Sequence, residues 1–169
     1  MVVKDRKVRP SAFQLGLAAE GAPLRTFADV RAGQALTNDI TGTWARRRFA
    51  DLPERTPTEA AAIFWALAED VTFFEHSLAD DAGHARAWAM AQHSLSTFDA
   101  FAREVLRQAP ADAQVIICSD HGNVEDLGTR NHTRNPVCVL TQGAAVNALP
   151  RFTRLDAIGQ AVRTLMETR

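Results

Sequence analysis

The sequence has few cysteines, no long apolar run and almost no net charge, and each absence excludes a class of protein. Two cysteines, Cys118 and Cys138, are too few for a disulfide framework, and both lie in apolar runs, so we expect reduced core thiols. The first ten residues contain no apolar signal core, and the stretch AAAIFWALA is far too short to span a bilayer. A cytoplasmic protein is therefore expected.

Charge and composition point to a soluble globular domain. The formal net charge of −1 gives no reason to expect nucleic acid or an anionic membrane as a partner. With 169 residues, 46% of them hydrophobic and 23% charged, the chain is long enough for one domain with a sizeable core.

The N-terminal part divides into a weakly patterned lead-in and the start of regular structure. Residues 1–25 show no clear periodicity, so we expect a poorly anchored segment. Thr26 and Asp29 have the spacing of a capping box, and Gly33 is a suitable stop for the short helix between them. A stronger helix is expected after Thr56, with Glu59 positioned to complete its cap.

The remaining elements alternate between strands and helices. We expect a strand from about Val71, strands in QVIICSD and NPVCVLTQG, and a C-terminal helix in TRLDAIGQAVRTLMETR. A long helix is expected at roughly 83–108, with His84 and Trp88 on its inward stripe. This alternation predicts an α/β fold with a mainly parallel sheet flanked by helices. Ligands of such sheets bind at the carboxyl ends of strands, where LADDAGH and SDHGN fall.

Two pairs of residues in these stretches are candidate metal ligands. Asp80 and His84 are four residues apart, which places a carboxylate and an imidazole on one side of a helix, although this stretch also suits a plain helix entry. Asp120 and His121 are adjacent at a strand end, where a turn through Gly122 lets both converge on a metal cluster. An Asx turn with a surface histidine is the alternative.

The long connection before the last strand contains a third candidate, His132. Arg130 and Arg134 flank it and suit an anionic oxygen, with an ordinary solvated loop as the alternative. His76 suits a structural role and His93 a solvated one. A set of carboxylates and imidazoles fits Zn²⁺ or Mn²⁺ better than Mg²⁺, and two such ions about 4 Å apart would form a clamp for displacement at phosphorus.

Three blocks, DDAGH, SDHGN and HTRNPV, occur in an order that resembles the metalloenzyme domain of cofactor-independent phosphoglycerate mutases, in the alkaline phosphatase superfamily. The resemblance covers most of the chain from about Thr26 and implies an alkaline-phosphatase-like fold. It implies that Asp80, His84 and His132 bind one metal and that Asp120 and His121 bind a second. It also implies phosphoryl transfer or phosphate ester hydrolysis, with two divalent ions as cofactors and a phosphorylated small molecule as substrate.

The chain departs from this family in its first part. The family places a further aspartate and a phosphorylated Ser or Thr nucleophile before the matched blocks, and neither motif is found here. We therefore expect residues 26–169 to be the C-terminal part of such a domain, with an incomplete sheet that a homodimer or an N-terminal partner segment covers. The alternative is a catalytically inactive remnant that binds metal or keeps only the fold. A triad of Ser119, Asp120 and His121 is disfavoured, because consecutive side chains rarely face one another.

Overall fold

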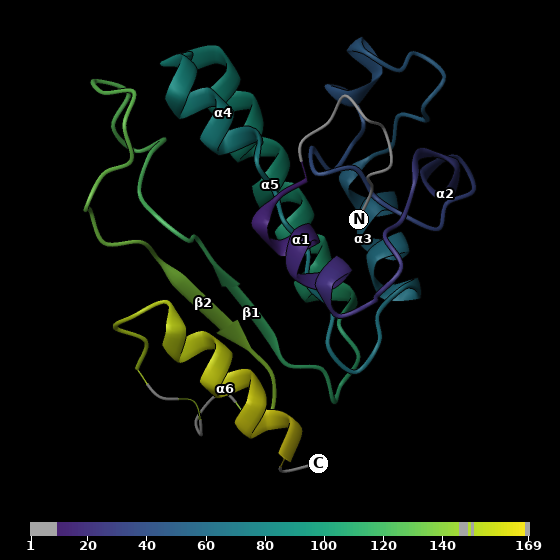
Figure 1. The fold of residues 1–169 in the computed structure, drawn as a ribbon, viewed down its shortest axis with the longest axis vertical. Helices are drawn as coiled ribbons and strands as arrows, with labels where there is room; N and C mark the ends of the chain where they lie inside the picture. The colour runs from purple at the N-terminus through teal and green to yellow at the C-terminus, as the bar shows by residue number, and fades with distance from the viewer. Residues whose placement is uncertain (1–9, 146–148, 150, 168–169) are drawn as a thin grey trace.

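The computed structural model describes residues 10–145, 149 and 151–167. Six α-helices, one short 3₁₀ helix and two strands make up the regular structure of these residues (Figure 1). In chain order they are α1 (Ala12–Ala19), α2 (Phe27–Arg31), η1 (Ala45–Arg47), α3 (Pro57–Ala66), α4 (Leu78–Ala85), α5 (Trp88–Gln108), β1 (Val115–Cys118), β2 (Val139–Gln142) and α6 (Asp156–Glu167).

Two helix starts are set by local hydrogen bonds that the sequence predicts. Thr26 caps α2 and Thr56 caps α3, each in a reciprocal capping box with the acid three residues later. The backbone N–H of Thr56 donates to Glu59 at 2.7 Å, and that of Glu59 donates back to the Thr56 hydroxyl. Gly33 follows α2 with φ of +73°, which confirms it as the helix stop.

The lead-in contains a helix that was not expected. Ser11 and Gln14 form a capping box of their own, and α1 follows from it. The helix forms because a local cap signal outweighs the weak periodicity. Residues 13–19 are exposed apart from Gln14, so the poor anchoring of this segment stays a prediction. Residues 1–9 lie outside the described part of the chain.

The single long helix predicted at 83–108 is two helices. Helix α4 ends at Ala85, and Arg86 adopts a left-handed conformation with φ of +54°, so that the N–H of Ala87 donates back to the Ala82 carbonyl. The chain changes direction there and the helical phase is lost. Trp88, expected on an inward stripe with His84, consequently starts α5 with 73% of its surface exposed.

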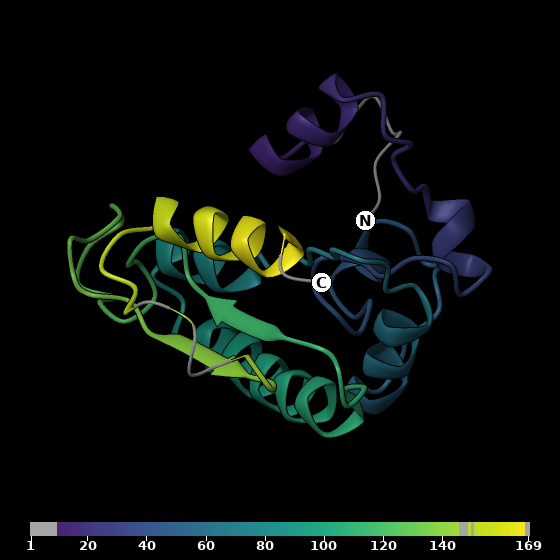
Figure 2. The same ribbon diagram turned by 90° about the horizontal axis from the view of Figure 1, so that it is seen from below.

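The two strands pair antiparallel, which corrects the expectation of a mainly parallel sheet for the described residues. Val115 lies opposite Gln142 and Cys118 opposite Val139. A parallel pair needs a crossover, usually a helix, and the connection from 119 to 138 contains none. Figure 2 shows α6 on one face of this sheet and α5 on the other. Cys118 and Cys138 are free as expected, but they are exposed rather than in the core.

The strand expected from Val71 does not form. The segment is β-branched and aromatic, but it runs without regular structure from Asp70 to Ser77 and pairs with neither strand. Its aromatic character is used in the core, where Phe74 packs against Phe64 and Phe101. A strand pattern needs a partner backbone as well as suitable side chains.

The main core lies between α3 and α5. Its buried members are Leu36, Ile40, Ala60, Ala61, Phe101 and Val105. The indole N–H of Trp65 on α3 donates to the Val105 carbonyl of α5 at 2.9 Å, which fixes the two helices across this core. Val115 of β1 packs on the same cluster, so the sheet and its following loop are placed relative to the helices. No helix in the described part of the chain has the length and apolar character to cross a membrane.

Candidate metal centre

The loop that joins β1 to β2 folds back onto α4. In Figure 1 it extends from the sheet toward that helix, and hydrogen bonds show that the two meet. The Arg86 guanidinium donates to the Leu127 carbonyl at 2.9 Å, and the His84 ring lies 2.6 Å from the Arg130 carbonyl. The loop is closed by a bridge in which the Thr133 N–H donates to the Gly122 carbonyl at 2.9 Å. Residues far apart in the sequence therefore share one small region.

Asp80, His84 and His132 come together at this contact. Asp80 Oδ1 lies 3.4 Å from His84 Nε2 and 3.4 Å from His132 Nε2. The two Nε2 atoms are 3.1 Å apart, close enough to share a proton. A carbonyl oxygen only accepts, so His84 Nδ1 donates to the Arg130 carbonyl, and Nε2 is the ring nitrogen that faces Asp80 and His132.

These separations match the requirements of a coordinated ion. Tetrahedral ligands at about 2.0–2.1 Å from zinc lie about 3.3–3.4 Å from one another. The three measured separations of 3.1, 3.4 and 3.4 Å are close to this edge length. The second ring nitrogen of His84 bonds to a backbone carbonyl, which is the usual support of a metal-bound histidine.

Unpaired polar atoms give a second indication. Within the described part of the chain, Asp80 Oδ1 and His121 Nδ1 are buried side-chain atoms without a hydrogen-bond partner. Buried polar atoms are nearly always paired, so such atoms call for a water or an ion as partner. The carboxylate oxygen that lacks a donor is the same atom that faces His84 and His132. The residues present therefore fit a divalent metal.

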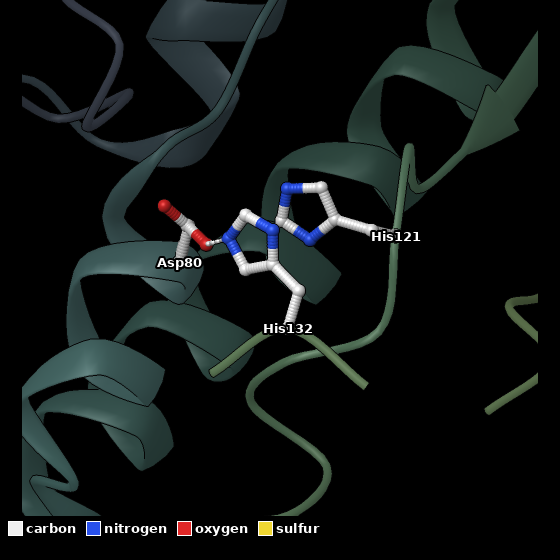
Figure 3. A group of neighbouring side chains, drawn as sticks. All are labelled: Asp80, His121 and His132. Carbon is white, nitrogen blue, oxygen red and sulfur yellow. Dashed lines mark ion pairs between the residues drawn. The ribbon is translucent and has the colours of Figure 1, made fainter. Parts of the chain in front are cut away.

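His121 joins the same group from the end of β1. Donor atoms of Asp80, His121 and His132 all lie within 4.8 Å of one another (Figure 3). The His121 ring stacks on that of His132, with centroids 3.6 Å apart and planes at 17°. Asp120 is exposed, with its Oδ2 3.4 Å from His121 Nε2. The structure thus groups Asp80, His121 and His132, with His84 beside Asp80 and His132 and with Asp120 beside His121.

The other predicted residues have clear positions. Arg130 and Arg134 are exposed, and Arg130 contributes to the cluster through its carbonyl oxygen. His76 is structural, as expected: its ring lies 2.8 Å from the Asn38 carbonyl and 2.9 Å from the Ser94 hydroxyl. Burial lowers the pKa of His76. His93 is exposed, as expected.

Sequence reasoning missed two residues that hold the loop in place. Asn123 is buried against α4 at Gly83, where any β-carbon would overlap the Asn123 amide. Glu125 accepts hydrogen bonds from Asn123, Thr133 and Asn135, and these bonds, that from Thr133 first, lower its pKa to about 2. The only sequence signal for Asn123 and Glu125 was their position two and four residues after His121.

A separate hollow of about 660 Å³ lies beside α4. Its lining includes Asn38, Asp39, Trp44 and Asp81, and none of the seven predicted site residues. Desolvation and the neighbouring Asp80 carboxylate raise the pKa of Asp81. The two adjacent acids on α4 therefore face different surroundings: Asp80 contacts the histidine cluster, and Asp81 lines this hollow.

Comparison with protein families agrees with the geometry. The sequence model of the Metalloenzyme superfamily matches residues 56–168. The chain belongs to this superfamily. The match covers the five predicted ligands and both arginines, and it confirms the expected alkaline-phosphatase-like metalloenzyme at the level of the superfamily. Residues 26–55, which the resemblance also included, lie outside it. No curated protein and no solved structure matches significantly.

Proposed function

We propose that this member of the Metalloenzyme superfamily carries ligands of a two-metal site for phosphoryl transfer or phosphate ester hydrolysis. The observation that supports this most is the convergence of Asp80, His84 and His132, whose facing atoms lie 3.1–3.4 Å apart. Asp80 and His84 lie one turn apart on α4, whereas His132 comes from a loop beyond α5, so its meeting with them is a product of the fold.

The proposed arrangement assigns Asp80, His84 and His132 to one ion and Asp120 and His121 to the second. Mixed imidazole and carboxylate donors favour Zn²⁺ or Mn²⁺. A bound pair of ions would supply charge neutralisation for displacement at phosphorus. The chain's own residues hold and orient the ligands: the Arg130 carbonyl fixes the His84 ring, and the His121–His132 stack fixes both imidazole planes.

The finer assignment is a phosphoglycerate-mutase-like domain with a phosphorylated small molecule as substrate. Exposed Arg130 and Arg134 flank His132 in sequence, and guanidinium groups suit phosphate oxygens. Residues 26–169 would then form the C-terminal part of the domain, and an N-terminal partner segment or a second copy would complete it. Both strands of the described sheet have an unpaired edge that such a partner can extend.

A specific observation favours the alternative, in which the chain binds metal without catalysing a reaction. The two hydroxyls nearest the ligands in sequence are already engaged. Ser119 donates to the His121 carbonyl at 2.8 Å, and Thr133 donates to the Glu125 carboxylate. Both hydroxyls are held by contacts within the loop, which suits a structural role.

Metal titration of two neighbouring variants tests the proposal. Calorimetry with Zn²⁺, Mn²⁺ and Co²⁺ is expected to show two sites in the wild-type protein. Asp80→Asn keeps the size of the side chain but removes the facing charge, and it should weaken the first site by more than about 100-fold, beyond the loss typical of a supporting residue. The matched control Asp81→Asn, one position along α4, should bind like wild type.

An assay with an aryl phosphate separates the two functions. Hydrolysis that depends on the added metal and disappears in Asp80→Asn would support phosphoryl transfer. Tight metal binding without hydrolysis, even with an N-terminal segment supplied, would support the non-catalytic alternative. Absence of metal binding by the wild-type protein would contradict both.

A further inference from the structure

Glu125 connects the two sides of the loop that carries His121 and His132. Its Oε1 accepts hydrogen bonds from the Thr133 hydroxyl and from the Asn135 side-chain amide, the latter at 2.9 Å. Its Oε2 accepts the backbone N–H of Asn123 at 2.6 Å. One carboxylate thus joins the segment directly after His121 to the segment directly after His132.

The backbone beside Glu125 is shaped to admit this carboxylate. Gly122 and Thr133 form the isolated bridge that closes the loop. A β-carbon at Gly122 would overlap both the Thr133 hydroxyl and Glu125 Oε1. Glycine is therefore required at this position, because a β-carbon would enter the space that the carboxylate and the Thr133 hydroxyl occupy.

The three donors suit an ionised acceptor. An ionised carboxylate has acceptor sites only, and Glu125 meets a hydroxyl, an amide and a backbone N–H. These bonds keep its pKa at about 2, with the Thr133 bond as the largest cause. At neutral pH the connection is therefore complete in the protein before any ion binds.

We propose that Glu125 is a positioning residue for the metal centre: it fastens the His121 and His132 segments together and so sets the spacing of the two stacked rings. The hydrogen bonds of Glu125 go to Asn123, Thr133 and Asn135, so Glu125 acts through chain neighbours of the proposed ligands. The inference rests on the proposed function, because a ring spacing matters to function only if the rings bind metal. It goes beyond that function by assigning a residue outside the ligand set.

The loop itself offers a matched control. Asp126 is the next residue, is also an exposed acid, and accepts the Gly128 N–H at 2.8 Å. That bond is local and does not reach the His132 side of the loop. Asp126→Ala removes the same charge from the same loop, whereas Glu125→Ala also breaks the connection between its two sides.

Cobalt titration measures the proposed effect, with Co²⁺ as the probe and its visible absorption as a signature of coordination geometry. Glu125→Ala should raise the Kd by about 10–100-fold, the range for residues that support metal ligands, and should shift the spectrum. The Kd of Glu125→Gln should lie between those of wild type and Glu125→Ala, because the amide nitrogen cannot accept the hydrogen bond that the replaced oxygen accepted. Asp126→Ala should stay within about twofold of wild type.

Thr133→Val tests the connection from its other end and leaves the carboxylate in place. It should weaken Co²⁺ binding in the same direction, and the double variant with Glu125→Ala should bind no more weakly than Glu125→Ala alone, since both changes break one contact. This variant also keeps the test valid if Glu125→Ala does not fold. In metal-free protein, the Asn123 and Thr133 amides should exchange hydrogen faster in Glu125→Ala.

The outcomes separate the two proposals. If wild-type protein binds no Co²⁺, both the metal function and the role of Glu125 are wrong. If wild type binds Co²⁺ and the Glu125 and Thr133 variants bind with the same Kd and spectrum, only the role of Glu125 is wrong. An Asp126→Ala variant as weak as Glu125→Ala would show a general charge effect and would also overturn the positioning role.

Discussion

Adding a methyl group at Gly83 on α4 tests how the loop from 119 to 138 packs on this helix. Gly83 is buried, and a β-carbon there would overlap the amide of Asn123, which is only 6% exposed. Asn123 lies two residues after His121, so a displaced Asn123 moves the His121 segment away from Asp80. The perturbation is Gly83→Ala, alone and together with Asn123→Ala, which vacates the space.

Two opposing effects determine how Gly83→Ala changes the free energy of unfolding. Alanine is favoured over glycine inside a helix by about 1 kcal/mol. Overpacking a filled site costs about 1–3 kcal/mol. Without Asn123, Gly83→Ala should therefore stabilise by about 1 kcal/mol, and with Asn123 present this gain should vanish or reverse. The side-chain amide of Asn123 has no hydrogen-bond partner within the described residues, so Asn123→Ala removes packing on α4 but no hydrogen bond of that amide.

Urea unfolding of the four proteins in this cycle measures the coupling. We expect a coupling energy of about 1–3 kcal/mol, and each 1 kcal/mol should move the Tm by about 2–4 °C at this chain length. The Kd for Co²⁺ should rise in Gly83→Ala and recover in the double variant. Equal stabilisation by Gly83→Ala in both backgrounds would refute the contact between α4 and the loop.

Three further predictions concern single side chains. Thr56→Ala removes the cap of α3 and should lower the free energy of unfolding by about 1 kcal/mol in urea, whereas no loss would contradict the capping box. Trp65→Phe deletes the indole bond to the Val105 carbonyl and should cost about 1 kcal/mol or more by the same measurement, with an unchanged midpoint as the contrary result. The low pKa of Glu125 means that its bonds stabilise the fold above pH 4.5 and are lost as pH falls toward 2, so the stability difference between wild type and Glu125→Gln should shrink over that range and not stay flat.

The parts of the fold that the sequence predicted are those decided by neighbours along the chain. The capping boxes at Thr26 and Thr56 involve residues three apart, and both are confirmed. The short apolar runs of β1 and β2 also form strands where expected. The direction in which two strands pair depends on the segment that connects them. The alternation of strands and helices suggested helical crossovers, but the loop from 119 to 138 contains no helix.

Two of the misses have a common physical cause, which is contacts distant in sequence. Arg86 is not a residue type that signals a left-handed helix end, yet its bond to the Leu127 carbonyl supports that conformation and divides the expected long helix. Glu125 has an ordinary surface composition around it, and its importance depends on Thr133 and Asn135 coming close. The grouping of Asp80 with His84 and His132 could be predicted because the order of the sequence motifs indicated it. Metal binding itself stays a prediction.

The position of Asp80 and His132 on opposite sides of α5 in the sequence has a mechanical consequence. An ion held between them would act as a reversible cross-link, closing a long chain segment and reducing the entropy of the unfolded state as a disulfide does. A two-stranded sheet is marginal alone, so the sheet would gain most from this staple. Chelation should then expose the loop from 119 to 138 to proteases before it affects the α3–α5 helix pair, making metal supply a control on the lifetime of the protein.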